Sequence, residues 1–98
     1  MKERLDAFVL YVSGRRGASR KVEETVRRVL DGAGSHKYSL EIIDVSVSPE
    51  RAEADGVRAV PALAPPPSLR GRRIVGDLSE EERIRAFLAK LCGEASPL

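Results

Sequence analysis

The sequence predicts an α/β fold with the element order β-α-β-α-β-β-α and a mixed four-stranded sheet. Three observations favour this fold class. Short apolar runs alternate with segments of helical periodicity, which is typical of α/β proteins. A proline begins the apolar run at residues 61–64, a position at which a strand tolerates its missing N–H group. Residues 79–91 combine a helix start signal with an amphipathic pattern.

The first half of the chain has the pattern of a β-α-β unit. Residues 7–12 form an apolar run too short for a helix, which is typical of a strand covered on both faces. After a loop at residues 14–17, Ser19 is expected to cap a helix that ends at Gly32. The apolar residues of that helix recur at helical spacing: Val22, Val26, Val29 and Leu30. A second strand is expected from Tyr38 to about Val45.

Residues 48–75 are expected to hold a short helix and a hairpin. Ser48 would cap a helix that has Pro49 at its first position and ends near Gly56. Two short strands follow at residues 61–64 and 72–75, and the loop between them contains three consecutive prolines at 65–67. Placed after a β-α-β unit, this arrangement predicts the hairpin of the thioredoxin-like fold. In that hairpin the Val60–Pro61 peptide bond is cis, so Pro61 is expected to be a structural cis-proline.

Several signals agree on the last helix. Ser79 and Glu82 have the spacing of a capping box. Glutamates at 80–82 and Lys90 lie where they complement the two ends of the helix dipole. One face is apolar, formed by Ile84, Phe87, Leu88 and Leu91. Gly93 is expected to end the helix, and Asp77 to organise the turn that leads into it.

Length and composition predict one domain over residues 1–98, with loose termini at about 1–5 and 94–98. No apolar run reaches the roughly 18 residues of a membrane span, and the start lacks a signal-peptide pattern. The single cysteine excludes an internal disulfide and favours a reducing cytoplasm. The formal net charge of +2 and the 4% content of aromatic residues indicate no nucleic-acid surface.

The sequence offers little catalytic, cofactor or metal chemistry. A thioredoxin-fold oxidoreductase needs a low-pKa cysteine at the start of its first helix, where residues 15–20 contain no sulfur. Ser19 would be either a plain helix cap, the interpretation we prefer, or a serine that activates glutathione. Cys92 adjoins the apolar face of the last helix and is expected to be buried and inert. His36 is the only histidine and has no second ligand at metal-binding spacing, so we expect an exposed loop residue.

Two groups of arginines are candidates for a partner-binding surface. One lies by the first helix and consists of Arg15, Arg16 and Arg20. The other lies in the hairpin and consists of Arg70, Arg72 and Arg73. A planar guanidinium group suits carboxylates at an interface. The alternative, that both groups are solvated surface charge, stays open at this point.

A set of motifs in a fixed order resembles the KaiB family of circadian-clock proteins, over the span from Phe8 to Leu91. The motifs are Leu10-Tyr11-Val12-Ser13-Gly14, Ile43-Asp44-Val45, Pro61-Ala62-Leu63-Ala64, the triple proline, and Arg73-Ile74-Val75-Gly76-Asp77-Leu78-Ser79. The resemblance implies a non-enzymatic protein without a cofactor that binds KaiC, a hexameric RecA-type ATPase. It also implies competition with a histidine kinase whose sensor domain has the same fold. Alternatives are that the chain is such a sensor domain, or a glutathione-dependent enzyme.

The resemblance further implies two folds, a thioredoxin-like state that binds the ATPase and a tetrameric ground state with a rearranged C-terminal half. The rearranged state needs a helix around the proline-rich segment, where each proline in a helix interior would cost about 3 kcal/mol. It also needs a strand near the C-terminus, which the helix signals of residues 79–91 oppose. We therefore predict the thioredoxin-like state, and homo-oligomer formation stays open.

Overall fold

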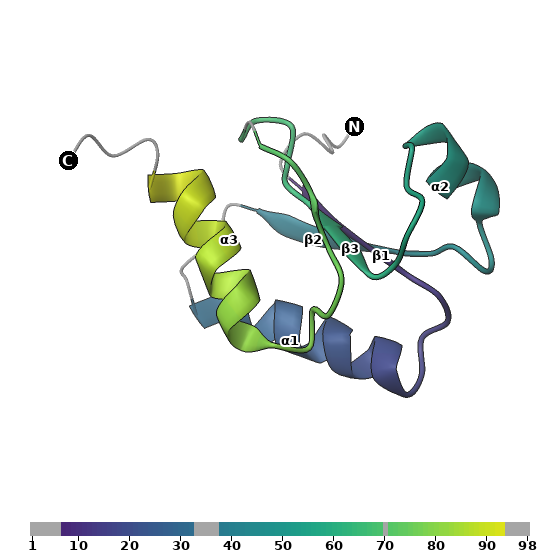
Figure 1. Ribbon diagram of the computed structural model, residues 1–98, viewed down its shortest axis with the longest axis horizontal. Coiled ribbons are helices and arrows are strands. Elements are labelled where there is room, and N and C mark those ends of the chain that lie inside the picture. Colours follow the sequence, from purple (N-terminus) through teal and green to yellow (C-terminus); the bar gives the residue numbers. More distant parts are fainter. Residues whose placement is uncertain (1–6, 33–37, 70, 94–98) are drawn as a thin grey trace.

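The structure is a computed structural model that describes residues 7–32, 38–69 and 71–93 (Figure 1). Its elements follow the predicted order. They are β1 (Ala7–Val12), α1 (Ala18–Gly32), β2 (Ser39–Asp44), α2 (Pro49–Ala54), β3 (Ala62–Ala64), β4 (Ile74–Val75) and α3 (Glu81–Gly93). Among these residues, no helix combines the length and the apolar character that a membrane crossing requires.

The four strands form one mixed sheet in the order β2-β1-β3-β4. β1 runs parallel to β2 and antiparallel to β3, and β4 is antiparallel to β3. Leu10 in the central strand is aligned with Ile42 on one side and with Leu63 on the other. The predicted α/β class and mixed sheet are therefore confirmed, with β2 and β4 as the two edge strands.

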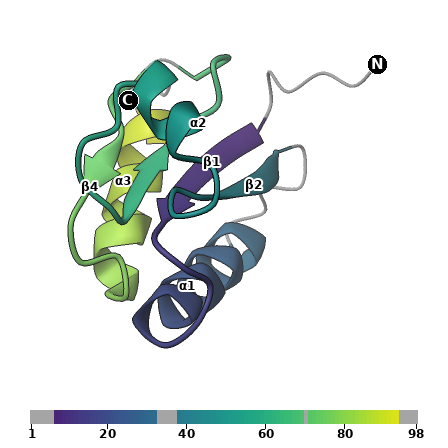
Figure 2. The same cartoon turned by 90° about the vertical axis from the view of Figure 1, so that its right-hand side faces the viewer.

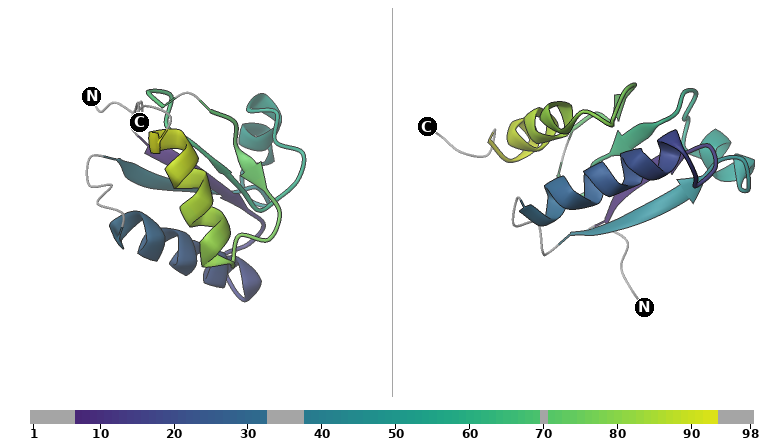
Figure 3. Two further views of the ribbon diagram at one scale, coloured as in Figure 1. Left: turned by 60° about the vertical axis from the view of Figure 1, so that its left-hand side comes forward. Right: turned by 90° about the horizontal axis from the view of Figure 1, so that it is seen from below.

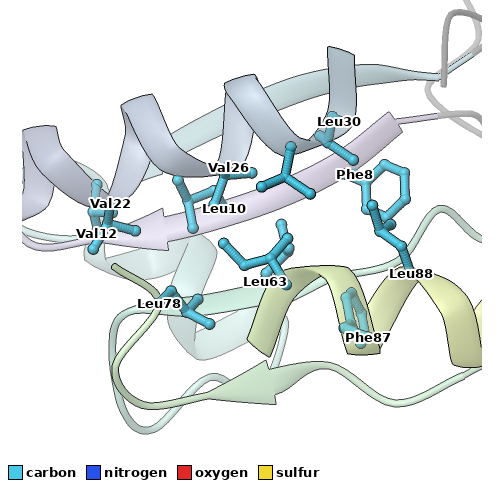
Figure 4. Close-up of a cluster of buried hydrophobic side chains, with 12 residues drawn as sticks. Phe8, Leu10, Val12, Val22, Val26, Leu30, Leu63, Leu78, Phe87 and Leu88 are labelled. Atoms are coloured by element: carbon cyan, nitrogen blue, oxygen red, sulfur yellow. The ribbon is translucent and has the colours of Figure 1, made fainter. Parts of the chain in front are cut away.

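Alternate residues of β1 face opposite sides of the sheet, as the pleat requires. Phe8, Leu10 and Val12 contribute to the main core, in which the sheet packs against α1 and α3 (Figures 3 and 4). The two helices supply Val22, Val26, Val29, Leu30, Ile84, Phe87 and Leu88. Leu10 and Leu63 are both fully shielded from solvent, and truncation of either to alanine is expected to cost about 2–5 kcal/mol.

The second face of the sheet is covered less completely. Tyr11, Ile43 and Ala62 form a smaller buried cluster there, with Val57 and Val60 packed against it. α2 lies on this side (Figure 2) but has only six residues, none of them buried. Polar contacts must therefore contribute to holding α2 against the sheet.

Two predicted helix caps are wrong, and a third is correct in position but makes no capping bond. α1 begins at Ala18, and the Ser19 hydroxyl donates to the Ser13 carbonyl at 3.0 Å. Ser48 is at the N-cap position of α2, as predicted, but its side chain makes no capping bond. α3 begins at Glu81, so Ser79 and Glu82 do not form a capping box.

The physical reason for the last correction lies two residues before Ser79. The Ser79 hydroxyl and N–H group both donate to Oδ1 of Asp77, at 2.6 and 3.1 Å. An aspartate that accepts bonds from the backbone two positions on forms a local turn that competes with a helix cap. Asp77 thus organises the approach to α3, as predicted, and Ser79 belongs to that turn.

Candidate partner-binding surface

The start of α1 lies beside Pro61, and the Val60–Pro61 peptide bond is cis, as predicted. A cavity of about 140 Å³ between them is lined by Val12, Ser13, Ala18, Ser19, Val22, Val60 and Pro61. These lining residues include no thiol. The Ser19 hydroxyl is already committed to the Ser13 carbonyl, so it has no proton left to donate to a glutathione sulfur. This arrangement favours a structural role for Ser19 over the glutathione alternative.

The loop before α1 is anchored by Asp44, at the end of β2. Oδ1 of Asp44 accepts the Gly14 N–H at 2.8 Å, the Ser46 N–H at 3.0 Å and the Ser46 hydroxyl at 2.6 Å. The Ser46 hydroxyl, followed by the Gly14 N–H, holds the pKa of the Asp44 carboxyl below its ordinary value. Gly14 has a φ of 83°, which favours glycine at this turn. Asp44 therefore positions the loop that carries Arg15 and Arg16.

The three arginines near α1 differ in what they can still bind. Arg15 donates to both carboxylate oxygens of Glu23, at 3.2 and 3.1 Å, and this contact holds the pKa of Glu23 below its ordinary value. Arg20 is paired with Glu24 at 3.1 Å. The exposed side chain of Arg16 makes no polar contact with the described residues, and only the Arg16 carbonyl is engaged, by the Ser19 N–H at 3.1 Å. Among these three arginines, Arg16 is the one whose donors remain available to a partner.

The arginines of the hairpin also differ in what they can still bind. Arg73 donates to the carbonyls of Asp55 and Gly56, at 3.1 and 3.0 Å, and so ties the hairpin to the end of α2. Arg72 is exposed and makes no polar contact with the described part of the chain. Arg70, His36 and the side chain of Cys92 lie outside the described residues. The structure therefore assigns an internal role to Arg73 and leaves Arg72 available.

The sequence analysis missed a polar cluster on the face of the sheet beside α2. Tyr11 belongs to the apolar run predicted at residues 7–12, and it is buried, but its hydroxyl donates to Oδ2 of Asp55 at 2.7 Å. Burial first, and then the bond to Asp55, raise the pKa of Tyr11 to about 12. Arg51 lies 3.9 Å from Asp55 and 3.5 Å from Glu41. The pattern of alternation along β1, which puts Tyr11 opposite to the main core, is the signal that points to this face.

Among the described residues, no group of three or more histidine, cysteine, aspartate or glutamate side chains lies together as metal ligands. The polar groups around the start of α1, the hairpin and the end of α2 instead form local turns and ion pairs. Exposed guanidinium groups lie in the loop before α1, at Arg16, and beside the partly apolar lining formed by residues 74, 87 and 91, at Arg72. Such an arrangement suits contact with carboxylates of another molecule.

Comparison with solved structures places the fold among thioredoxins. A mutant thioredoxin from Halobacterium salinarum NRC-1 superposes with a TM-score of 0.65 at 22% identity, covering 87% of this chain and 73% of that chain. The germline-specific thioredoxin Deadhead from Drosophila melanogaster gives a TM-score of 0.64 at 23% identity, covering 87% and 79%. At these identities the likeness shows the fold alone, and it confirms the predicted thioredoxin-like class.

Comparison of sequences is more specific. A family model described as the KaiB domain matches residues 9–90. A circadian clock oscillator protein KaiB from Prochlorococcus marinus (strain MIT 9313) is 42% identical over 90 residues, covering 89% of this chain and 73% of that protein. A protein of the same name from Synechococcus elongatus (strain ATCC 33912 / PCC 7942 / FACHB-805) is 39% identical over 85 residues, covering 87% and 83%. The chain therefore belongs to the KaiB family.

Proposed function

We propose that this chain is a non-enzymatic, cytoplasmic binding protein that engages a KaiC-type RecA-like ATPase and thereby regulates clock or stress signalling. The observation that carries the proposal is the cavity beside cis-Pro61, whose lining contains no thiol. The one cysteine of the sequence is Cys92, near the opposite end of the chain. The fold is thus kept without the residue on which thioredoxin chemistry depends.

The arrangement of the arginines supports a role in binding another protein. Arg15 and Arg73 make contacts that order the loop and the hairpin, and Arg20 forms an exposed pair with Glu24 one turn along α1. The side chains of Arg16 and Arg72 are exposed and make no polar contact with the described residues, so they can meet carboxylates of a partner. Arg70 stays a candidate from the sequence. We propose that these arginines contribute to the surface that contacts the ATPase.

A pull-down from the native cell extract tests the proposal. The tagged chain should retain a RecA-like ATPase, and the purified pair should form a complex in solution. The absence of such an ATPase from the retained proteins, together with no complex between the purified pair, contradicts the proposal. Retention of a histidine kinase alone would instead favour the sensor-domain alternative.

A second assay addresses the enzymatic alternative. Purified protein should neither bind glutathione nor reduce insulin disulfides, because the cavity lining beside Pro61 contains no thiol and the Ser19 hydroxyl has a backbone acceptor. Measurable turnover in either assay would overturn the non-enzymatic part of the proposal. Cys92→Ser is the matched control, since it removes the sole sulfur nucleophile of the sequence.

A further inference from the structure

A groove of about 410 Å³ runs between the edge strand β4 and the C-terminal half of α3. Figure 2 shows the two elements side by side. The apolar lining of the groove comes from Ile74, Phe87 and Leu91. Phe87 and Leu91 are four positions apart on α3, so they lie on one face of the helix and form a continuous apolar strip. Ile74 and Leu91 pack against the main core but are only partly buried, so the groove exposes the rim of that core.

The charged residues of this groove are all cations. Arg72 and Lys90 line it and are exposed, and neither side chain makes a polar contact with the described residues. Arg73 also lines it, but its guanidinium group is bonded to the carbonyls of Asp55 and Gly56. The acidic residues of α3 are confined to its first turn, at the other end of the helix. An apolar floor thus lies next to two cations without a described counter-charge.

We propose that this groove binds an extended segment of a partner protein in which an acidic residue and an aliphatic residue alternate. Arg72 and Ile74 are two positions apart and both line the groove. In an extended segment lying beside them, residues two apart point to the same side. A carboxylate of the segment would then face Arg72 while an aliphatic side chain fills the space over Ile74 and Leu91. A second carboxylate would lie near Lys90.

An extended peptide fits the site better than a helix or a nucleic acid. β4 is a two-residue strand at the edge of the sheet, and no other strand of the described residues pairs with its outer side. A peptide lying along such an edge can add main-chain contacts to the side-chain contacts. The groove does not include Arg16 but shares Arg72 with the proposed ATPase-binding surface, and the peptide test does not depend on the identity of the ATPase.

The probe for this proposal is a fluorescein-labelled pentapeptide, Glu-Ser-Leu-Ser-Glu, titrated with the full chain and followed by fluorescence anisotropy. Two matched peptides separate the charge from the apolar contribution: Lys-Ser-Leu-Ser-Lys and Glu-Ser-Ser-Ser-Glu. Saturable binding is expected for the first peptide only. The affinity should fall with added salt, because exposed ion pairs are screened within about 10 Å at 0.1 M ionic strength. Equal binding of the lysine peptide, or no saturable binding of the glutamate peptide, overturns the proposal.

Variants locate the site. The double variant Arg72→Glu with Lys90→Glu should weaken binding by at least about tenfold, as expected when two favourable charge contacts become repulsive. Arg58→Glu is the control for local charge, because Arg58 is exposed and lies outside this groove. Backbone amide shifts should change on peptide addition around Ile74 and Leu91. Shift changes confined to other parts of the chain would place the site elsewhere and overturn the proposal.

The remaining outcomes identify other occupants. If the peptide binds only after residues 94–98 are deleted, the groove is occupied by the chain's own C-terminal segment, and the proposal fails. If Arg72→Glu converts a dimer into a monomer, the occupant is a second copy, and the proposal fails as well. If hexanoate displaces the peptide completely at equal concentration, the groove is a small-acid site. A normal thermal unfolding midpoint of each variant shows that lost binding does not reflect lost folding.

Discussion

The hydroxyl of Tyr11 donates a 2.7 Å hydrogen bond to Oδ2 of Asp55, which joins the central strand β1 to the residue that follows α2. The two residues are 44 positions apart in the sequence. Because α2 buries none of its own residues, it depends on contacts of this kind. Arg73 also holds this segment, because its guanidinium group donates to the carbonyls of Asp55 and Gly56. The end of α2 is therefore held by a residue of β1 and by the residue that precedes β4.

Replacement of Tyr11 by phenylalanine should lower the free energy of unfolding by about 1–2 kcal/mol, the usual range for a hydrogen bond to a partly exposed carboxylate. The aromatic ring stays in place, so the loss reports the hydroxyl alone. Urea denaturation measures it. Asp55→Asn is the control, because the amide oxygen can still accept the bond and most of the stability should remain. A Tyr11→Phe variant as stable as the parent would contradict this account of the α2 anchor.

Tyr11 should titrate well above the ordinary tyrosine value. Burial and the bond to Asp55 raise its pKa from 10.0 to about 12. A raised folded-state pKa means that the stabilisation is complete below pH 10.0 and is lost as the pH rises toward about 12. The variant Tyr38→Phe leaves Tyr11 as the sole tyrosine, so the ultraviolet absorbance of tyrosinate reports it directly. A midpoint near the ordinary value in the folded protein would contradict the prediction, and the urea-unfolded variant supplies that reference.

Asp44 should make the protein sensitive to acid. The Ser46 hydroxyl, followed by the Gly14 N–H, lowers the pKa of its carboxyl from the ordinary 3.8. A lowered folded-state pKa contributes stability above pH 3.8, and that contribution is lost as the pH falls through the folded value. Asp44→Asn should therefore flatten the acid side of a plot of the unfolding midpoint against pH. Ser46→Ala should do so in part. An unchanged acid limb in both variants would contradict the prediction.

Periodicity and local signals predicted every element, because buried strands and amphipathic helices leave a strong local pattern. The cis bond at Pro61 was predicted from the place of that proline in a thioredoxin-like hairpin. The helix starts were less accurate. Asp44 and Asp77 each precede a serine by two positions, and both accept that serine's hydroxyl and N–H. This shared Asp-x-Ser pattern was present in the sequence, yet the serine at 79 was assigned to a cap. At Ser79, the local turn formed with Asp77 replaces the capping box.

The arginines show what a sequence cannot separate. The sequence alone does not distinguish Arg15, Arg16 and Arg20. In the folded protein, Arg15 and Arg20 form ion pairs with glutamates of α1. Arg73 is directed to two backbone carbonyls that precede it by 18 and 17 positions. These pairings depend on helix phase and on the packing of α2 against the hairpin. Composition and spacing therefore identified the groups, and tertiary structure selected the available members.

Gly76 should be sensitive to substitution. Its φ of 118° lies in a region that side chains rarely adopt, and a Cβ there would lie 3.0 Å from Nη1 of Arg83. Arg83 donates to the carbonyls of Val75 and Asp77 on either side of this glycine. Gly76→Ala is thus expected to cost about 1–3 kcal/mol from backbone strain, in addition to displacement of Arg83. Chemical denaturation measures the loss.

Gly32→Ala is the matched control for that substitution. Gly32 is the last residue of α1, and a Cβ there would meet nothing within 4 Å. The free energy of unfolding of the Gly32→Ala variant should be unchanged or slightly increased, because alanine reduces the conformational freedom of the unfolded chain. Equal losses at both glycines would show that the turn before α3 is not specially constrained.

Arg16→Glu should weaken binding of the proposed ATPase partner without affecting folding. Arg16 is exposed and has no described contact to lose, so the unfolding midpoint should not change. The expected loss of affinity is about 1–2 kcal/mol, the range for a contributing interface residue short of a dominant one. Calorimetric titration of the purified pair at low and high salt measures it, since a lost ion pair also reduces the salt dependence. Arg15→Glu is unsuitable here, because it would also break the pair with Glu23 and disturb the loop.

Arg58→Glu is the control for the change of net charge in that titration. Arg58 is exposed, and its side chain, like that of Arg16, makes no polar contact with the described residues. If Arg58→Glu weakens the complex as much as Arg16→Glu does, the partner senses overall charge and the loop before α1 has no special role. If neither variant changes the affinity, the ATPase contacts a different face, and the hairpin arginine Arg72 becomes the next position to reverse. A loss specific to Arg16→Glu would place the loop held by Asp44 in the interface.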